Sequence, residues 1–484
     1  MNGWGGGGAS TPGSAGWPVG SGGVDGRTGG WWCGGPARET GGGRVRIVVV
    51  GAGIVGAATA YELVRAGAET VLVDAAREGR ATSAGAGIIC PWTGRDEEPL
   101  PTAGAGHYPR LLAALAEDGQ GDVGHRGVGA LLLLPPDPDE AARTIARVTA
   151  RAAADPHAGE VTTVDATEAR RLFPALAPAS GSTESSGGPI PSGGPMPSGG
   201  PMPSGGPMPS GGRAPAGGAA SSDGAASSGG MASSGGAAPA GGGGFTGRAL
   251  HISGAARLDG RRMCAALVAA AERYGLRTVR GTARIETRGG RVRGVRVDGE
   301  PLAADAVVAA AGAWSPALLE PVGVRVPVVP QRGQIAHLRL PGADTTHWPV
   351  VLPGTGHYLL TFDDSRVVAG ATREEGTGFD HRVTAQGLAE VLNQALAVAP
   401  GLASATLVET RVGFRPAAPD GQPLLGTVPE PAGLVVANGL GPAGLTAGPY
   451  AGAVAAALAL GREPGLDLSP YDPLRDAVRT TRTT

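Results

Sequence analysis

A glycine-rich turn between two apolar segments constrains the fold of this chain more than any other feature. The sequence GAGIVG at residues 51–56 follows a β-branched run at 45–50 and leads into residues 54–66, which contain few helix breakers. A second apolar run, at residues 70–74, ends in an acid. Strand, turn, helix and strand in this order predict a parallel βαβ unit, the context that a glycine motif of this spacing requires.

The turn has the chemistry of a dinucleotide site. Gly51 permits the tight turn, Gly53 lets a pyrophosphate approach the backbone, and Gly56 lets helix and strand pack closely. The helix N-terminus then faces the phosphates. Asp74 can accept hydrogen bonds from a ribose diol and would repel a 2′-phosphate, which favours FAD or NAD over NADP. The predicted contacts are Gly51, Gly53, Ile54, Val55, Gly56 and Asp74. A purely structural turn is the alternative.

Two long stretches lack the aliphatic residues that a core requires. Residues 1–43 are rich in Gly and contain Ser and Trp, and residues 177–244 consist mainly of Gly, Ser, Pro and Ala. The second stretch contains four tandem copies of Gly-Gly-Pro-Ile/Met-Pro-Ser at 187–210. Such segments bury too little apolar surface to offset the entropy of ordering. We therefore expect a disordered tail and a disordered insert, with a partner-binding repeat as the alternative for the insert.

Charge and composition exclude several classes of function. The formal net charge of −2 gives no electrostatic reason to expect nucleic acid as a partner. Cys33, Cys90 and Cys264 form no CxxC pair, and the eight histidines show no metal-ligand spacing, so we expect neither a disulfide framework nor a metal site. No signal peptide or transmembrane segment is evident. A cytoplasmic protein is the expectation, and peripheral membrane association stays open.

Two later segments resemble further parts of a nucleotide-binding sheet. Residues 433–437 have the composition of a strand, and a Gly-rich turn at 438–444 and a small-residue helix at 445–460 follow. Ordinary helix capping is the alternative interpretation of that turn. A strand at 305–311 runs into Gly312, and such strand ends lie where open α/β sheets bind ligands. We expect one nucleotide domain assembled from the start, middle and end of the chain, with Gly312 at the cofactor.

In this order, the motifs resemble the D-amino-acid oxidase family of FAD-dependent oxidoreductases, which includes glycine oxidase and D-amino-acid dehydrogenase. The resemblance extends from Arg44 to about Arg475, without the insert. The segments that carry it are 47–74, TSAGAGI at 82–88, AAGAWS at 310–315, Tyr358 with GAT at 370–372, GFRP at 413–416, PDG at 419–421 with Pro423, and 438–449.

The resemblance implies which residues contact the cofactor. The loop after the second strand matches the family's contacts to the diphosphate and flavin, which here are Thr82, Ser83, Ala84 and Gly87. The C-terminal loop matches the family's contacts around the flavin pyrimidine edge, which here are Gly439, Gly441, Gly444, Leu445 and Thr446. No cysteine lies near that loop, so we expect FAD to be bound non-covalently.

The resemblance also implies a site for the substrate carboxylate. Arg415 matches the Arg-Pro arginine that binds this group in glycine oxidase-like members, and Tyr358 matches the tyrosine that assists it. A guanidinium fits a carboxylate bidentately, and a phenol adds a donor. The alternatives are a structural salt bridge of Arg415, for instance to Asp420, and a buried tyrosine that only satisfies its hydroxyl. Asp74 departs from the Glu that most members carry, with equivalent chemistry.

We therefore predict an α/β protein with a doubly wound, Rossmann-like FAD-binding domain and an α+β substrate domain built on a mixed or antiparallel sheet. The expected boundaries are 44–97 with 245–326 and 413–475 for the FAD-binding domain, and 98–176 with 327–412 for the substrate domain.

The reaction that the resemblance implies is FAD-dependent oxidative deamination of a small amino acid, in the first instance a D-amino acid. Hydride transfer to flavin N5 would produce the imine and then the keto acid, with O2 or a quinone or dye as the electron acceptor. Glycine- or sarcosine-type amine oxidation is the alternative within the family. An NAD-dependent dehydrogenase and a non-catalytic binding protein are the alternatives outside it.

Overall fold

The computed structural model describes residues 44–94, 99–177 and 247–475, all of which belong to one unit. The predicted disordered tail at 1–43 lies outside the described residues. So does the predicted insert at 177–244, apart from Ala177 at its start. The expectation of disorder in these two stretches stays a prediction.

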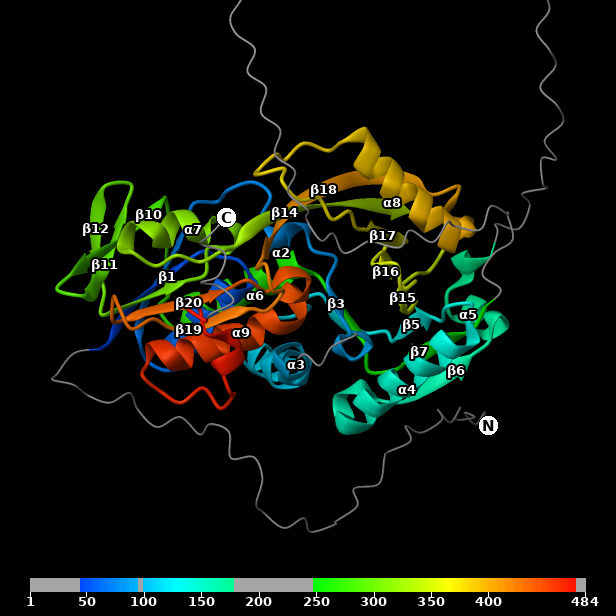
Figure 1. Cartoon of the computed structure of the whole chain (residues 1–484), viewed down its shortest axis with the longest axis horizontal. Coiled ribbons are helices and arrows are strands. Elements are labelled where there is room, and N and C mark those ends of the chain that lie inside the picture. The colour runs from blue at the N-terminus through cyan, green and yellow to red at the C-terminus, as the bar shows by residue number, and fades with distance from the viewer. Residues whose placement is uncertain (1–43, 95–98, 178–246, 476–484) are drawn as a thin grey trace, which may run out of the picture. The chain divides into compact units, whose positions relative to one another are not determined.

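The first glycine motif lies at the end of a central strand of a six-stranded sheet (Figure 1). The strands lie in the order β19 (Leu424–Thr427), β20 (Leu434–Asn438), β13 (Ala306–Ala309), β1 (Arg46–Val50), β2 (Glu69–Asp74) and β9 (Arg277–Arg280). All neighbours are parallel except β19, which pairs with β20 in the antiparallel sense. The strands come from the start, middle and end of the chain, as the sequence predicted.

Both faces of this sheet are covered, which explains why its strands are apolar throughout rather than alternating. Ile47 and Val49 of β1 pack in a core with helices, whereas Val48 and Val50 pack in a second core with a small antiparallel sheet. The helices of the first layer are α1 (Ile54–Arg65), α3 (Pro99–Glu117), α6 (Gly260–Arg273) and α9 (Gly444–Ala459). The opposite layer contains β10 (Ala283–Arg288), β11 (Arg291–Val297), β12 (Glu300–Ala303) and α7 (Ser315–Leu319).

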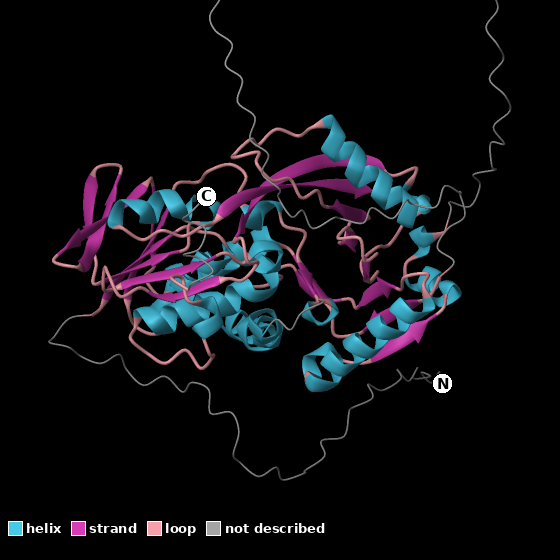
Figure 2. Cartoon of the chain, viewed as in Figure 1, coloured by secondary structure: helices cyan, strands magenta, loops and turns pink. Residues whose placement is uncertain are grey.

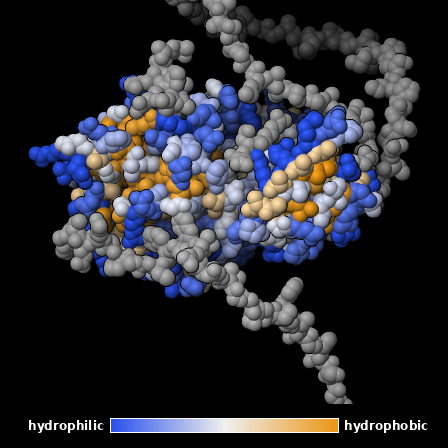
Figure 3. All heavy atoms as spheres, turned by 60° about the horizontal axis from the view of Figure 1, so that its bottom comes forward, coloured by the Kyte–Doolittle hydropathy of each residue, from blue (hydrophilic) through white to orange (hydrophobic). Residues whose placement is uncertain are grey.

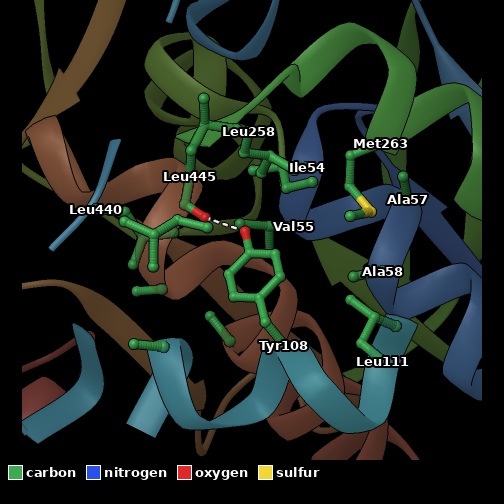
Figure 4. Packing of buried hydrophobic residues seen from close by; sticks show 14 of the residues in the cluster. Ile54, Val55, Ala57, Ala58, Tyr108, Leu111, Leu258, Met263, Leu440 and Leu445 are labelled. Atoms are coloured by element: carbon green, nitrogen blue, oxygen red, sulfur yellow. Dashed lines mark hydrogen bonds between the residues drawn. The ribbon is translucent and has the colours of Figure 1, made fainter. Parts of the chain in front are cut away.

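Helices α1 and α9 approach each other closely because α9 consists largely of small residues. A Cβ atom added at Gly448 would collide with Ile54, and one added at Gly452 would collide with Ala58. This contact holds the beginnings of the two helices side by side at the same edge of the sheet. Figure 4 shows part of this core, with Leu445 of α9 near Ile54 of α1.

A second, eight-stranded sheet is mixed (Figure 2). Its strands lie in the order β18 (Thr406–Ala417), β14 (Val329–Arg339), β17 (Arg366–Gly370), β16 (Tyr358–Thr361), β15 (Val350–Leu352), β5 (Ala130–Leu133), β7 (Ala249–Ile252) and β6 (Val161–Val164). Only the β5–β15 pair is parallel among the pairings of this sheet that the described residues form. The alternation of β14 and β18 residues across their long antiparallel register decides which side chains reach the site described below.

Helices cover this sheet as well. Helix α8 (Ala385–Val398) lies over β14 and β17 (Figure 1), and α5 (Ala166–Leu172) shares its core. Helix α4 (Pro138–Ala154) packs in the first core instead. Helix α2 (Ala81–Ala84) and a small sheet of β3 (Ile88–Ile89), β8 (Ala256–Leu258) and β4 (His125–Gly127) follow, and short 3-10 helices connect several of the elements.

The predicted fold class, an α/β cofactor-binding part with a second mixed sheet, is confirmed. The domain boundaries stay a prediction; β7 joins the eight-stranded sheet although residues 245–326 were grouped with the cofactor domain. In the described ranges, no helix has both the length and the apolar character needed to cross a membrane. Figure 3 shows hydrophilic surface interspersed with separate hydrophobic patches on the face that it presents.

Candidate active site

A cavity of about 390 Å³ is lined by residues at the carboxyl ends of the parallel strands and by residues of the eight-stranded sheet. Most of the predicted site residues line it, namely Gly51, Gly53, Ile54, Val55, Asp74, Thr82, Ala84, Gly87, Gly312, Tyr358, Arg415, Gly441, Gly444 and Leu445. The other predicted contacts, Gly56, Ser83, Gly439 and Thr446, are not among the described residues that line it. The tertiary fold thus brings the two predicted sites, for cofactor and for substrate, to one cavity.

The glycine turn has geometry that larger residues cannot adopt. Gly51 has φ +106° and its amide donates to Val73 O at 2.7 Å. A side chain there would overlap the carbonyl oxygen of Ala310, and a side chain at Gly56 would overlap that of Gly51. Gly56 therefore acts through packing behind the cavity, and Gly51 keeps the turn at its wall.

Asp74 connects the second strand to this turn. Its carboxylate accepts a hydrogen bond from the amide of Ala52 at 2.6 Å and another from the amide of Ala76. The guanidinium of Arg80 lies 3.6 Å away. A carboxylate has about four lone-pair sites, so these contacts leave acceptor capacity toward the cavity that Asp74 lines.

The two helices that begin at the cavity, α1 and α9, have no capping side chain at their own N-cap residues. The N-cap residues of α1 and α9 are Gly53 and Ala443, which have no side-chain acceptor. By contrast, side chains cap α4, α6 and α8 through Asp137, Asp259 and Thr384. The hydroxyl of Thr82 accepts from the amide of Ile54 at 3.1 Å. Uncapped helix starts leave amide donors and a positive dipole end for an anionic ligand.

The C-terminal loop is fixed by contacts behind the cavity wall. Thr446 Oγ1 donates to Ile88 O at 2.9 Å, and Tyr108 Oη donates to Leu445 O (Figure 4). The side chain of Asn438 donates to Gly312 O at 2.8 Å and accepts from the amide of Gly439. Gly439 and Thr446 therefore position the loop rather than line the cavity.

Strand β18 joins the substrate end of the cavity to the loop after β2. The amide of Phe414 donates to Gly79 O at 2.9 Å, and Phe414 forms a bridge with Arg80. Ser83 lies in the short helix α2 that follows, and its carbonyl accepts a hydrogen bond from Arg261 at 2.9 Å. The residue after Phe414 is Arg415, so this contact sets Arg415 beside the predicted diphosphate loop.

Arg415 and Tyr358 are accommodated by glycines on neighbouring strands. A Cβ atom at Gly333 of β14 would lie 2.5 Å from Nη1 of Arg415. Gly370 of β17 stands opposite Tyr358 in register, and a Cβ atom there would collide with the phenol. Burial raises the pKa of Tyr358 to about 12, so the phenol stays a neutral donor at ordinary pH.

Arg415 forms no structural salt bridge in the part of the chain that the structure describes. It donates to the carbonyl of Thr372 at 3.1 Å, while Asp420 pairs with Arg475 at 2.8 Å. The Asp420 alternative for Arg415 is therefore wrong. Burial lowers the pKa of Arg415, and the positive charge of Arg373 adds to this, but an arginine remains charged. A desolvated cation with one neutral partner is suited to binding an anion.

Comparison with known proteins agrees with this geometry. The model of the family described as FAD dependent oxidoreductase (DAO) matches residues 46–191 and 233–458. The chain belongs to this family. This FAD-dependent oxidoreductase is 40% identical to the uncharacterized oxidoreductase YurR of Bacillus subtilis strain 168, over 88% of this chain and 98% of that protein. It is 29% identical to glycine oxidase of Pseudomonas aeruginosa, over 88% and 98% of the two chains.

A solved structure is similar over nearly its whole length. The crystal structure of iminodiacetate oxidase from Chelativorans sp. BNC1 matches with a TM-score of 0.72 and 38% identity, covering 88% of this oxidoreductase and 99% of that chain. The resemblance inferred from the ordered motifs is thus confirmed, and FAD rather than NAD is the family's cofactor.

The residues present in this FAD-dependent oxidoreductase fit FAD. Cβ atoms added at Gly312, Gly441 and Gly444 would meet nothing within 4 Å. The backbone at these glycines therefore borders the open cavity, and larger side chains there would occupy part of it. The glycine turn, Asp74 and the two helix starts would then hold the diphosphate, the ribose and the ring.

Sequence reasoning missed several residues of the cavity. Thr282 lines it beside Gly281, whose amide donates to Asp74 O at 3.0 Å. Trp314 and Arg373 line it at the substrate end. Trp314 lies within the quoted motif AAGAWS, and Arg373 directly follows the motif GAT, so adjacency to these motifs was the available signal.

Proposed function

We propose that this oxidoreductase oxidises the Cα–N bond of a small α-amino acid or its N-substituted relative. The observation that carries the proposal is Arg415, a desolvated cation without an acidic partner among the described residues, beside Tyr358 in the cavity that fits FAD. When bound, FAD supplies a two-electron acceptor for the hydride that leaves Cα. Names of relatives, glycine oxidase and iminodiacetate oxidase, support an amine substrate.

The roles of the chain's own residues follow from their chemistry. Arg415 binds both oxygens of the carboxylate, and Tyr358 donates a third hydrogen bond, so Cα is held in one orientation. The amine must be neutral for its lone pair to form the C=N bond as hydride leaves. A neutral amine needs no dedicated side-chain base, so we assign none. Water then hydrolyses the imine to the keto acid.

We propose that FAD is held without a covalent bond. Cys90 and Cys264, the cysteines among the described residues, do not line the cavity, and burial raises the pKa of each to about 12. Buried thiols of this kind are poor nucleophiles. Acid precipitation of the purified protein should leave the yellow colour in the supernatant. Colour that stays in the pellet would contradict non-covalent binding.

Anaerobic bleaching of the bound flavin tests the reaction. The panel contains glycine, sarcosine, D- and L-proline, and several D- and L-amino acids, with α-hydroxy acids as controls. We expect bleaching by small amines and not by the corresponding hydroxy acids, and a small D-amino acid rather than its L-enantiomer as substrate where Cα is chiral. Bleaching by hydroxy acids alone would overturn the proposal. Reoxidation under O2, compared with a quinone or dye, then identifies the electron acceptor.

A further inference from the structure

The substrate end of the cavity contains a second cation besides Arg415. Arg373 lines the cavity, and its guanidinium lies near Gly356, where an added Cβ atom would be 3.8 Å from Nη2. Its charge acts on both Arg415 and Tyr358. Two guanidinium groups that face one space repel each other unless an anion lies between them.

Arg373 has no acidic partner among the described residues, although two acids follow it directly in sequence. Glu374 is bound by Arg332 at 2.5 Å and by the side chain of Gln334 at 2.8 Å. Glu375 instead lies 3.3 Å from the side chain of Gln331. Both neighbouring acids thus bind other residues, and the charge of Arg373 is available to a ligand in the cavity.

The backbone on which Arg373 is carried is held firmly. Arg332 and Glu374 exchange two backbone hydrogen bonds of 2.9 Å, and the guanidinium of Arg332 also binds Asp380 at 3.0 Å. Phe379, in the same loop, stacks on Trp314 with ring centroids 5.0 Å apart. A fixed loop places Arg373 at the cavity wall before any ligand binds, which lowers the ordering cost of binding.

The charge of the cavity wall favours an anion with more than one negative group. Asp74 is the one acid among the described lining residues, and it stands at the carboxyl end of β2. The lining residues of the eight-stranded sheet and the loop after β17 include Arg415, Arg373 and Tyr358 but no acid. A substrate with a single carboxylate satisfies Arg415 and leaves Arg373 without a counter-ion.

We infer that Arg373 binds a second carboxylate, and that the substrate is a secondary amine flanked by two carboxymethyl groups, of which iminodiacetate is the simplest. This inference rests on the proposed function and names its substrate class. Arg415 and Tyr358 hold the carboxylate next to the carbon that is oxidised, and Arg373 holds the other.

The reaction balances with FAD as the oxidant. One CH2–NH unit loses a hydride to FAD and a proton from nitrogen, which leaves a C=N bond. Water adds to this carbon, and the C–N bond breaks with return of a proton to nitrogen. One molecule each of glyoxylate and glycine is formed, and FAD gains two electrons.

Matched substrates test the inference. Sarcosine differs from iminodiacetate only by lacking the second carboxylate. We expect kcat/KM for iminodiacetate to exceed that for sarcosine by roughly tenfold or more, the typical effect of a charge-assisted hydrogen bond. Arg373→Gln should lower kcat/KM for iminodiacetate much more than for sarcosine, mainly through KM, and so remove this preference. Arg382→Gln is the control, because Arg382 lies on the same loop, pairs with Asp380 at 2.8 Å and does not line the cavity.

Binding of unreactive analogues supplies a readout that does not depend on turnover. Glutarate has a CH2 group in place of the NH of iminodiacetate, and butyrate corresponds in the same way to sarcosine. In calorimetric titration of the wild-type holoenzyme, glutarate should bind more tightly than butyrate. In Arg373→Gln, glutarate and butyrate should bind with equal affinity.

Each other outcome is decisive. Equal losses for sarcosine and iminodiacetate in Arg373→Gln would assign Arg373 a general role and overturn the inference. A wild-type enzyme that oxidises sarcosine or glycine without preferring iminodiacetate, and binds glutarate no better than butyrate, would overturn the inference and leave the proposed function intact. A wild-type enzyme that oxidises no amine would overturn the proposed function itself.

Discussion

The two ends of the cavity are built by different means. At the cofactor end, small residues, chiefly glycine and alanine, make up much of the wall, and the helix starts at Gly53 and Ala443 have no side-chain cap of their own. At the substrate end, long side chains from strands and one loop supply the chemistry, above all Arg415 and Tyr358. Where the backbone forms the wall, even one added methyl group should prevent cofactor binding. Where side chains supply the contacts, each substitution should remove only the contribution of one group to substrate binding. Substitutions at the two ends should therefore differ in the size and kind of their effects.

The largest effect is expected at the backbone end, from Gly51→Ala. The methyl group would overlap Ala310 O at a position with φ +106°, so the turn must move and FAD should be lost almost completely. The ratio of flavin absorbance to protein absorbance measures this. Gly67→Ala is the matched control, since Gly67 has φ +86° but open space around its Cβ position. It should lower stability by about 1 kcal/mol and keep FAD. Equal flavin loss in both variants would contradict the role of close packing at Gly51.

At the substrate end, Arg415→Ala should lower kcat/KM by roughly a hundredfold or more, because a charge-assisted bidentate contact in a desolvated site is lost. Arg415→Lys should recover only part of this, since an ammonium cannot bind both oxygens in one plane. Steady-state kinetics together with flavin content and melting temperature distinguish binding from scaffolding. Loss of flavin or of cooperative unfolding in Arg415→Ala would indicate a structural role. The two ends of the cavity would then not differ in how they respond to substitution.

A smaller effect is expected from Tyr358→Phe, which removes one neutral donor and should raise KM by about tenfold with flavin content unchanged. Because burial raises the pKa of the phenol to about 12, its proton stays bound throughout the usual assay range. The ratio of wild-type to variant kcat/KM should therefore be constant from about pH 7 to about pH 10. A ratio that declines toward one over this range would show that the phenol ionises much earlier.

The smallest effect is expected outside the cavity. A chain that begins near Gly43 and replaces residues 177–244 by a brief linker should bind FAD and turn over as the full chain does, because these stretches contain too few aliphatic residues to contribute to a core. Flavin content, cooperative unfolding and kcat/KM measure this. A shortened chain that folds and binds FAD but lacks turnover would instead assign a function to the repeat.

The backbone end of the cavity could be predicted because its constraints are local in sequence. The spacing of Gly51, Gly53 and Gly56 between a strand and a helix requires nothing from the rest of the chain. The carboxylate that follows 18 residues after Gly56 belongs to the next strand of the same βαβ unit. The cofactor-binding part of the fold followed from the same local patterns, whereas the second sheet followed only from the family resemblance. Most of the predicted contacts line the cavity. Gly56, Ser83, Gly439 and Thr446 were expected as contacts and instead lie outside the described lining.

The substrate end depended on contacts between distant segments. Arg415 and Tyr358 were recognised only through resemblance, and the alternative partner Asp420 could be dismissed only when Arg475 was found beside it. Apart from its place directly after the motif GAT, nothing in the sequence distinguishes Arg373 from other arginines that precede acids. Its charge faces the cavity because Arg332, on a strand more than forty residues away along the chain, takes up Glu374. Local patterns determine where the backbone turns, but the partners of a charged side chain are decided by strand register and packing, which no local pattern encodes.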